Sequence, residues 1–249
     1  MSHGILEIKG VSKSYTADLT KSVLFDINFS CQMGDIISII GPSGCGKSTL
    51  IKILGNVIEP SFGSVSFAGE SISRLRNEYS IGWIPQFPTL LKNRNVEKNI
   101  QLPLEIIGRD NKDVSNIIKL VGLEGDEDKY PFELSGGMKQ RVSFAQALSY
   151  SPKLLLLDEP FSALDEMTRE KMQNELLAIA RQNNPIIFFV THSVEEAVFL
   201  ADHVIIMTKK GAVAKIEKII KGERGDVNFR NSIEFFEQVK GIRNILANS

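Results

Sequence analysis

Short apolar runs rich in β-branched residues alternate along the chain with longer stretches whose apolar residues recur at helical spacing. Runs of about four to eight apolar residues are typical of buried strands, and a spacing of three to four residues is typical of amphipathic helices. The predicted strands are Leu6–Lys9, Ile36–Ile40, Ser64–Phe67, Ile81–Ile84, Leu154–Leu157, Ile186–Val190 and Val204–Met207. The predicted helices begin near Lys47, Val96, Lys112, Gly136, Asp165, Val194 and Ser232. This alternation indicates an α/β protein.

Two stretches depart from the alternation. Between about residues 87 and 150 the pattern is helical and contains no convincing strand, which predicts a helical subdomain set into the α/β core. After Gly225 the apolar residues again recur at helical spacing, which predicts a packing helix. We therefore expect one large domain over residues 1–225 and a C-terminal helical extension over residues 226–249.

Composition narrows the class of protein. Hydrophobic residues make up 43% of the chain and charged residues 24%, as in an ordinary globular protein. With 29 basic and 30 acidic residues the net charge is −1, so the basic excess of a nucleic-acid-binding protein is absent and we expect no nucleic-acid partner. No apolar run approaches the roughly 18–20 residues of a membrane helix. The chain has only two cysteines and shows no secretory signal pattern, and both observations favour a location in the cytosol.

The clearest motif lies between a predicted strand and a predicted helix. It fits the pattern G-x-x-x-x-G-K-[ST], and its residues are Gly41, Pro42, Ser43, Gly44, Cys45, Gly46, Lys47, Ser48 and Thr49. In such a loop the backbone N–H groups surround the β-phosphate of a nucleotide, Lys47 reaches the β- and γ-phosphates, and the Ser48 hydroxyl binds Mg²⁺. The alternative is a glycine-rich turn that contains a lysine by chance. The flanking strand and helix favour a nucleoside triphosphate site.

A second motif ends the predicted strand of four leucines. Four apolar residues in succession suit a strand that is covered on both faces, and Asp158 and Glu159 follow at its carboxyl end, where open α/β sheets bind ligands. We expect Asp158 to hold Mg²⁺ through water and Glu159 to polarise the attacking water. Pro160 cannot continue a central strand. The alternative is that these acidic residues serve only solubility.

A third motif, LSGGMKQR, begins a helix at residues 134–141. Ser135 is a suitable N-cap, and Gly136 and Gly137 follow in the first turn, where free N–H groups form a second anion site. A single ATP molecule does not need two phosphate sites from one chain. We therefore expect the second site to bind the ATP held by a partner chain.

Together these motifs resemble those of the ATP-binding cassette (ABC) ATPases. Residues 41–49 resemble the Walker A motif, residues 154–159 the Walker B motif, and residues 134–141 the signature motif. An adenine-stacking aromatic residue, a Q-loop glutamine, a D-loop and a switch histidine also occur in the family's order, at Tyr15, Gln86, Ser162–Asp165 and His192. The resemblance covers about residues 5–210. It implies a P-loop NTPase core with an inserted α-helical subdomain and an antiparallel β subdomain.

The resemblance further implies a head-to-tail homodimer with two ATP molecules at the interface, each held by one Walker A motif and the partner's signature motif. The implied catalytic residues are Lys47, Gln86, Glu159 and His192, and the implied Mg²⁺ ligands are Ser48, Gln86 and Asp158. Each of these residues also has a simpler explanation when it is considered alone. Tyr15 could pack on the surface, Gln86 could be an ordinary surface residue, and His192 could have a structural role. Ser193 and Glu196 fit a capping box that would fix His192 at the strand end.

The layout of the chain separates branches of the family. It has one cassette, a short gap between Gln86 and Ser135, no membrane span, and too few residues after His192 for a large regulatory domain. This layout is similar to that of free-standing ATPases that dock on separate membrane subunits of bacterial importers. Partners would be integral membrane permease subunits and, indirectly, a solute-binding protein. The expected location is peripheral, on the cytoplasmic face of the inner (plasma) membrane.

Two segments resemble the nitrate/sulfonate/taurine importer ATPases, at Glu159–Arg169 and Val190–Asp202. Departures from common family residues occur at Trp83, Pro85, Gln146 and Ser193. Residues 93–108 resemble the surface that receives a coupling helix of the membrane subunit. Leu102, Leu104, Ile106 and Ile107 either line that groove or belong to the subdomain core.

Three other functions remain open from the sequence. An exporter or lipid-handling ATPase would carry the same motifs, and so would a regulatory ABC ATPase without transport. A small-molecule P-loop kinase shares the first motif, but LSGGMKQR disfavours it.

Overall fold

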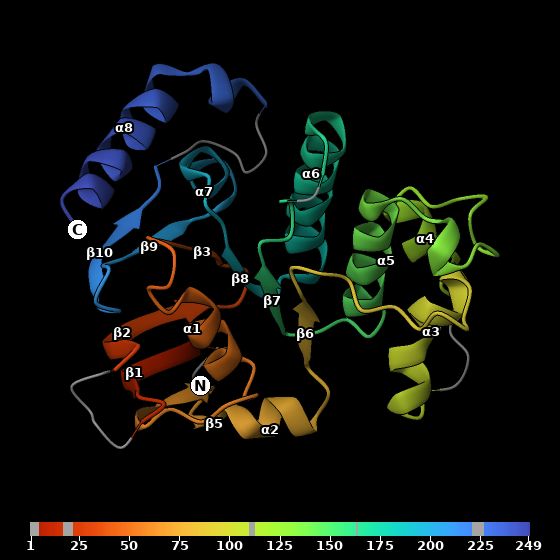
Figure 1. Ribbon diagram of the computed structural model, residues 1–249, viewed down its shortest axis with the longest axis horizontal. Helices are drawn as coiled ribbons and strands as arrows, with labels where there is room; N and C mark the ends of the chain where they lie inside the picture. Colours follow the sequence, from red (N-terminus) through yellow and green to blue (C-terminus); the bar gives the residue numbers. More distant parts are fainter. Residues whose placement is uncertain (1–4, 17–21, 110–112, 163, 221–226) are drawn as a thin grey trace.

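A computed structural model describes residues 5–16, 22–109, 113–162, 164–220 and 227–249. Its centre is a six-stranded sheet with the strand order β10-β9-β3-β8-β7-β6 (Figure 1). In that order the strands are Val213–Lys218, His203–Met207, Ile36–Ile40, Ile186–Val190, Leu154–Asp158 and Ile81–Ile84. The strands from β9 to β6 run parallel, whereas β10 pairs antiparallel with β9. Every residue of β3 and β8 is buried, as in parallel strands covered on both faces.

A second, antiparallel sheet has the order β2-β1-β4-β5. Its strands are, in chain order, β1 (Ile5–Lys13), β2 (Leu24–Gln32), β4 (Phe62–Phe67) and β5 (Glu70–Ser71). The pairs β1–β2, β1–β4 and β4–β5 are all antiparallel. The antiparallel β subdomain that the resemblance implied is therefore present.

The helices are α1 (Lys47–Leu54), α2 (Ile72–Asn77), α3 (Val96–Ile106), α4 (Ser115–Leu120), α5 (Gly136–Leu148), α6 (Glu166–Asn183), α7 (Val194–Leu200) and α8 (Ile233–Ala247). Two 3₁₀ helices, η2 and η3, cover Pro131–Glu133 and Val227–Asn231. Four predicted starts coincide with helix starts, and the predicted starts at Asp165 and Ser232 are the N-caps of α6 and α8. The start predicted near Lys112 lies outside the described residues.

Three strands, one α-helix and both 3₁₀ helices were not predicted from the sequence: β2, β5, β10, α2, η2 and η3. Strand β2 lacks a clean two-residue period because its pairing with β1 is irregular after Ile8, and Asp26 has a φ of 46°. Strand β10 lies at a sheet edge and has no fully buried residue. Helix α2 has only six residues, too few for a helical period to stand out.

The two faces of the six-stranded sheet pack against different partners. Leu154 and Leu156 of β7 face α1 and the antiparallel sheet, in one hydrophobic core. Leu155 and Leu157 face a second core that includes residues of α3, α5, α6, α7 and α8. Helices α1 and α5 consequently lie on opposite faces of the sheet (Figure 1).

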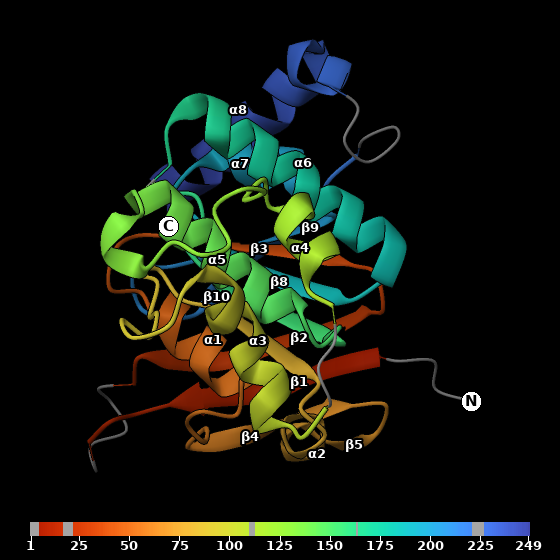
Figure 2. The ribbon, with the colours of Figure 1, turned by 90° about the vertical axis from the view of Figure 1, so that its right-hand side faces the viewer.

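The segment between β6 and β7 forms helices α3, α4, η2 and α5 and, in its described residues, no strand. The principal contact within it joins α3 to α5. Helix α8 lies at the other end of the molecule and packs on α7 and β9 (Figures 1 and 2). In the parts that the structure describes, no helix is both long and apolar enough to span a bilayer.

Candidate nucleotide site

The loop from Gly41 to Gly46 joins β3 to α1 in a conformation that requires glycine. Gly46 is the N-cap of α1 with a φ of 100°, in the left-handed region. A Cβ atom on Gly46 would lie 2.6 Å from the carbonyl oxygen of Val23, which is closer than real Cβ atoms approach. Gly44 also has a left-handed φ, of 79°. The loop therefore presents backbone N–H groups at the start of α1, where the helix dipole favours an anion.

Lys47 is buried, and its ammonium group is held by the loop itself. Its Nζ donates to the carbonyl oxygens of Gly41 at 2.8 Å and Pro42 at 3.0 Å. A buried ammonium needs such partners because an unpaired charge is costly away from water. The lysine is thus kept within the loop, at the start of α1.

Asp158 lies at the carboxyl end of β7, facing the first turn of α1. The Ser48 hydroxyl donates to its Oδ1 at 3.3 Å. Burial raises the pKa of the Asp158 carboxyl above its ordinary value, and the negative charge of Glu159 raises it further. The Ser48 hydrogen bond and the charges of Lys52 and Lys47 act in the opposite direction. A cation bound here would relieve the unfavourable environment of this carboxylate.

The residues around Asp158 fit Mg²⁺ bound together with a nucleotide. The Ser48 hydroxyl, the Asp158 carboxylate and the amide oxygen of Gln86, which contacts the adjacent Glu159, would supply the oxygen ligands that Mg²⁺ prefers. Among the residues with a described position, no group of three or more His, Cys, Asp or Glu side chains could hold a metal. Mg²⁺ commonly uses one or two carboxylates with waters and phosphates, so these residues would supply part of such a coordination shell.

Glu159 is held between two neighbouring strand ends. Gln86 Nε2, beyond β6, donates to Glu159 Oε2 at 2.8 Å, and His192 Nε2, beyond β8, pairs with Glu159 Oε1. The backbone N–H of Glu159 donates to the carbonyl oxygen of Val190 at 3.1 Å. Its φ of 49° lies in the left-handed region, which costs about 1–2 kcal/mol for a residue with a Cβ. Such strain is typical of functional sites.

His192 sits between two residues that are tied to each other. Thr191 Oγ1 donates to Glu196 Oε2 at 2.5 Å and accepts from the Ser193 N–H at 3.1 Å. Ser193 is the N-cap of α7, as predicted, and its Oγ accepts from the Glu196 N–H at 3.1 Å. The predicted capping box is incomplete, because the Glu196 carboxylate bonds Thr191 instead of the Ser193 N–H. The sequence pattern did not single out Thr191.

Tyr15 lies beside the phosphate loop, and Cys45 belongs to the loop. The Tyr15 side chain is 60% exposed, and its hydroxyl lies 3.3 Å from Thr49 Oγ1. Lys13 Nζ is 5.5 Å from the centre of the Tyr15 ring. An exposed ring beside the loop is available for stacking on a base. Cys45, by contrast, is buried, and burial raises the pKa of its thiol.

Ser135, Gly136 and Gly137 form a separate site. Ser135 caps α5, because its Oγ accepts from the Met138 N–H at 3.2 Å. A Cβ on Gly136 would meet no atom within 4 Å, so this helix start faces open space. Because α1 and α5 lie on opposite faces of the sheet, the chain does not bring these three residues to its own phosphate loop.

Further residues of the site were not found by sequence reasoning. Gln140 of α5 is buried, and its Nε2 donates to the carbonyl oxygen of Pro85 at 3.4 Å, next to Gln86. Arg169 Nη2 donates to the carbonyl oxygen of Leu164, in the segment after Glu159, at 2.9 Å. Both contacts join residues that lie far apart in the sequence or in different elements, so no local sequence pattern predicts them.

Comparisons with known proteins agree with this geometry. Residues 24–162 match the family described as ABC transporter. An ABC transporter ATP-binding protein of Methanocaldococcus jannaschii is 39% identical over 246 residues, covering 97% of this chain and 91% of the relative. The aliphatic sulfonates import ATP-binding protein SsuB of Bacillus cereus is 40% identical and covers 94% and 92% of the two chains. The taurine import ATP-binding protein TauB of Escherichia coli O157:H7 is 39% identical and covers 76% and 74%.

Solved structures are similar as well. A dimeric bacterial ABC transporter cassette has a TM-score of 0.77 at 28% identity and covers 87% of this chain and 100% of its own. A dimeric ATP-binding cassette in a post-hydrolysis state, bound to ADP and phosphate, has a TM-score of 0.76 at 28% identity, with the same coverage. A part of the cbiONQ transporter complex of Clostridium perfringens has a TM-score of 0.76 at 27% identity, covering 87% of this chain and 89% of its own. Family match, relatives and fold agree that the chain belongs to the ABC transporter family and is one of its ATP-hydrolysing cassettes.

Proposed function

We propose that this cassette hydrolyses Mg²⁺-ATP in a head-to-tail dimer and thereby drives import of a small solute through separate membrane subunits. The observation that carries the proposal is the position of the Glu159 carboxylate. It contacts Gln86 and His192 and lies next to Asp158, which faces Ser48 and the phosphate loop. This is the arrangement that a general base needs to act on a water beside a bound γ-phosphate.

In this proposal each residue has a separate role. Lys47 would turn from the loop carbonyls to the β- and γ-phosphates, and Ser48, Gln86 and Asp158 would hold the metal. Mg²⁺, when bound, neutralises the negative charge of the phosphates. Glu159 takes a proton from the attacking water, and His192 orients that water and the γ-phosphate.

Gln86 and Tyr15 complete the proposed site. Gln86 follows β6 and precedes the helical segment, so it is placed to report an occupied metal site to α3 and α5. Tyr15 stacks on the adenine, and this contact does not depend on the identity of the base because every base has an aromatic face. The segment over residues 87–150 acts as a helical subdomain of the 1–225 ATPase domain, and residues 226–249 act as a C-terminal extension.

The separation of the two anion sites supports the proposed dimer. Ser135, Gly136 and Gly137 lie at the open start of α5, on the opposite face of the sheet from α1. A second copy in head-to-tail orientation would bring its own α5 start to the ATP on the phosphate loop. The two similar cassette structures are described as dimeric, which supports this arrangement.

Docking on membrane subunits is supported by a groove between the β6 edge and α3. The groove has a volume of about 530 Å³, and its lining includes Leu102, Ile106, Ile107 and Tyr150. Leu104 is buried and belongs to the core, so three of the four candidate apolar residues line the groove and one does not. An exposed apolar groove suits an amphipathic helix from a partner. The chain would then sit on the cytoplasmic face of the membrane, with a solute-binding protein acting on the other side.

The cargo in this proposal is a small solute of the nitrate, sulfonate or taurine class. The similar proteins of Bacillus cereus and Escherichia coli are named for import of aliphatic sulfonates and taurine. In this proposal the membrane subunits carry the cargo, so the class rests on relatedness. Uptake of labelled taurine, an alkanesulfonate and nitrate by a deletion strain complemented with this chain tests it, and uptake of none of the three refutes the class.

Replacing Glu159 with glutamine tests the ATPase mechanism. The variant keeps the hydrogen-bonding shape but loses the base, so we expect ATP to bind normally and turnover to fall at least 100-fold. The trapped ATP should hold two chains together, which size-exclusion chromatography with light scattering would detect. Wild-type turnover, or a monomer at saturating Mg²⁺-ATP, would reject the proposed role. The complemented strain carrying Glu159→Gln should show no uptake.

A further inference from the structure

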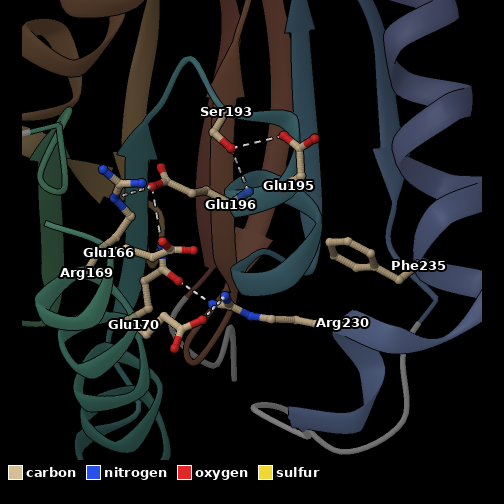
Figure 3. A pocket seen from close by; sticks show the side chains of 9 residues that line it. Glu166, Arg169, Glu170, Ser193, Glu195, Glu196, Arg230 and Phe235 are labelled. Carbon is tan, nitrogen blue, oxygen red and sulfur yellow. Dashed lines mark hydrogen bonds and ion pairs between the residues drawn. The ribbon is translucent and has the colours of Figure 1, made fainter.

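Arg230 belongs to the C-terminal extension but inserts between α6 and α7 (Figure 3). Its Nη1 donates to Glu170 Oε1 at 3.2 Å, and its Nη2 donates to Gln173 Oε1. Its guanidinium carbon lies 3.8 Å from the centre of the Phe199 ring. A planar guanidinium that bonds two acceptors and stacks on a ring is strongly fixed in orientation.

The residue that Arg230 holds is itself a link to α7. Gln173 is buried, and its Nε2 donates to Glu196 Oε1 at 3.3 Å. Arg169 Nε, also on α6, is 3.7 Å from the same carboxylate oxygen. Burial raises the pKa of Glu196, while the charges of Arg169 and Arg230 favour its ionised form. Arg230 therefore contributes both the position of Gln173 and part of the positive charge that balances Glu196.

Glu196 in turn fixes the residues on both sides of His192. Its Oε2 accepts from Thr191 Oγ1 at 2.5 Å, and its N–H donates to Ser193 Oγ at 3.1 Å. His192, between them, pairs with Glu159. An unbroken series of contacts thus leads from Arg230 through Gln173, Glu196 and Thr191 to the proposed switch histidine.

Two neighbouring cavities lie along this series. One, of about 280 Å³, is lined by Arg230 together with Gln173 and Phe235. The other, of about 180 Å³, is lined by Glu159 and His192. Arg169, Ser193 and Glu196 line both cavities. The side chains that separate Arg230 from the site therefore have room to move if Arg230 is removed.

We propose that Arg230 is a positioning residue for ATP hydrolysis, which holds His192 against Glu159 through Gln173, Glu196 and Thr191. The proposal rests on the role of His192 proposed above. It assigns the C-terminal extension a part in turnover, beyond covering α7. The competing explanation is that Arg230 only anchors the extension to the body of the molecule.

Arg230→Ala tests the proposal in the full chain. We expect kcat for ATP to fall about 10-fold or more, because a shift of about 1 Å in a reacting group can cost up to about 100-fold. The KM for ATP should stay within about twofold, because Arg230 touches no residue of the phosphate loop. Arg230→Lys should recover only part of the loss, since an ammonium group cannot bond both acceptors in a fixed plane.

Arg243→Ala is the matched control. Arg243 lies on the same extension and pairs with Glu195 of α7, whose other carboxylate oxygen accepts from Ser193 Oγ at 3.2 Å. The side chains of this pair are 61% and 47% exposed, so the pair contributes little, and Ser193 keeps its bond to the Glu196 N–H without it. Loss of the Arg243 side chain should leave kcat unchanged. An equal fall in kcat for Arg243→Ala and Arg230→Ala would show that any loosening of the extension is enough, which would overturn the proposal.

Gln173→Leu removes the middle link and provides a second route if Arg230→Ala folds poorly. It should lower kcat by a similar factor, and adding Arg230→Ala to it should have little further effect, because both changes break the same series of contacts. Fully additive losses in the double variant would contradict a shared path.

The imidazole of His192 gives a direct readout. The chain has three histidines, so the His192 signals in nitrogen-resolved NMR can be assigned by substitution. We expect Arg230→Ala to move them toward their positions in Glu159→Gln and Arg243→Ala to leave them in place. An Arg230→Ala protein with unchanged His192 signals and unchanged kcat, but a lower melting temperature, would show that Arg230 is only an anchor.

The two proposals can fail separately. If His192→Ala keeps wild-type turnover, the proposed role of His192 is wrong and the role of Arg230 falls with it. If His192→Ala is inactive while Arg230→Ala has normal kcat, only the role of Arg230 is wrong.

Discussion

At the scale of single residues, the site stores unfavourable features that a nucleotide would relieve. Glu159 has a left-handed backbone, and Asp158 is a partly buried carboxylate with a raised pKa next to another carboxylate. Lys47, by contrast, is paired with carbonyl groups of its own loop, which satisfies its buried charge. The backbone of Glu159 and the charge of Asp158 lower the stability of the fold slightly, and a ligand that binds beside them would offset that loss.

Asp158→Asn should stabilise the nucleotide-free chain near pH 7. A carboxyl whose pKa is raised by folding binds its proton more tightly in the folded chain, so its ionisation lowers stability. This loss is absent below the ordinary pKa of 3.8, grows as the pH rises toward the raised value, and is complete above it. In EDTA we expect a melting temperature about 2 °C or more above wild type at pH 7, and a difference that narrows toward pH 4.

Two controls sharpen this prediction. With Mg²⁺-ATP the order should reverse, because the variant loses a metal ligand and gains less from the nucleotide. Asp113→Asn should give no gain at pH 7, because a hydrogen bond from Ser115 lowers the pKa of that carboxyl. A melting temperature of Asp158→Asn that is below wild type in EDTA would contradict the electrostatic explanation.

At the scale of elements, two helix starts carry the proposed phosphate contacts, and they differ in how they are capped. Helix α1 begins at Gly46, which has no side chain to compete for the first N–H groups. Helix α5 begins at Ser135, whose hydroxyl accepts from the Met138 N–H. Gly136, which has open space around it, still leaves the start of α5 accessible to a second molecule.

Ser135→Ala separates the capping role from the role at the interface. Loss of the cap should lower the free energy of unfolding by about 1 kcal/mol. ATP-dependent dimerisation and turnover should fall about 10-fold or more, because the hydroxyl would also contact the partner's ATP. Ser71→Ala, which removes the N-cap serine of α2, is the matched control and should cost stability without affecting turnover. Equal effects of the two variants on turnover would count against the interface role.

The same scale shows what the sequence could predict. The strands Ile36–Ile40, Ile81–Ile84 and Ile186–Val190 were predicted with their observed bounds. The first and third are buried throughout, which makes nearly all their residues apolar, whereas Ile81–Ile84 alternates between buried and half-buried positions. Strand β10 was missed, because an edge strand tolerates the polar residues that hide a strand in the sequence. In the site, motif residues were found from their spacing. The contact of Arg230 with Gln173, which are 57 residues apart, depends on tertiary packing and leaves no local pattern.

At the scale of the whole molecule, the groove beside α3 lies at the start of β6, and Gln86 follows the other end of that strand. Its lining combines Arg76 and Tyr79 from the α2 region with Leu102 and Ile106 from α3. A helix bound in this groove would therefore contact both the segment before β6 and the helical segment after it. Movement of one relative to the other would be transmitted to the bound partner.

Ile106→Asp should weaken association with the membrane subunits. Ile106 is 66% exposed and lines the groove, so a carboxylate there would oppose an apolar partner without disturbing the core. We expect co-purification with the membrane subunits and ATP-driven uptake to fall at least 10-fold, while ATP binding stays normal. Val57→Asp is the matched control, because Val57 is a similarly exposed apolar residue that is absent from the groove lining. Normal co-purification of Ile106→Asp would place the docking surface elsewhere.

The opposite placement of α1 and α5 on the central sheet has a kinetic consequence. Each active site would combine the phosphate loop of one chain with the start of α5 of another. In dilute solution the rate of ATP hydrolysis per chain would then rise with the protein concentration until all chains are paired. Membrane subunits that hold two cassettes side by side would replace that bimolecular step with an intramolecular one, at an effective concentration in the millimolar range for short connections. Binding to the membrane subunits would then determine the rate of ATP hydrolysis, and cassettes that are not bound to them would hydrolyse little ATP.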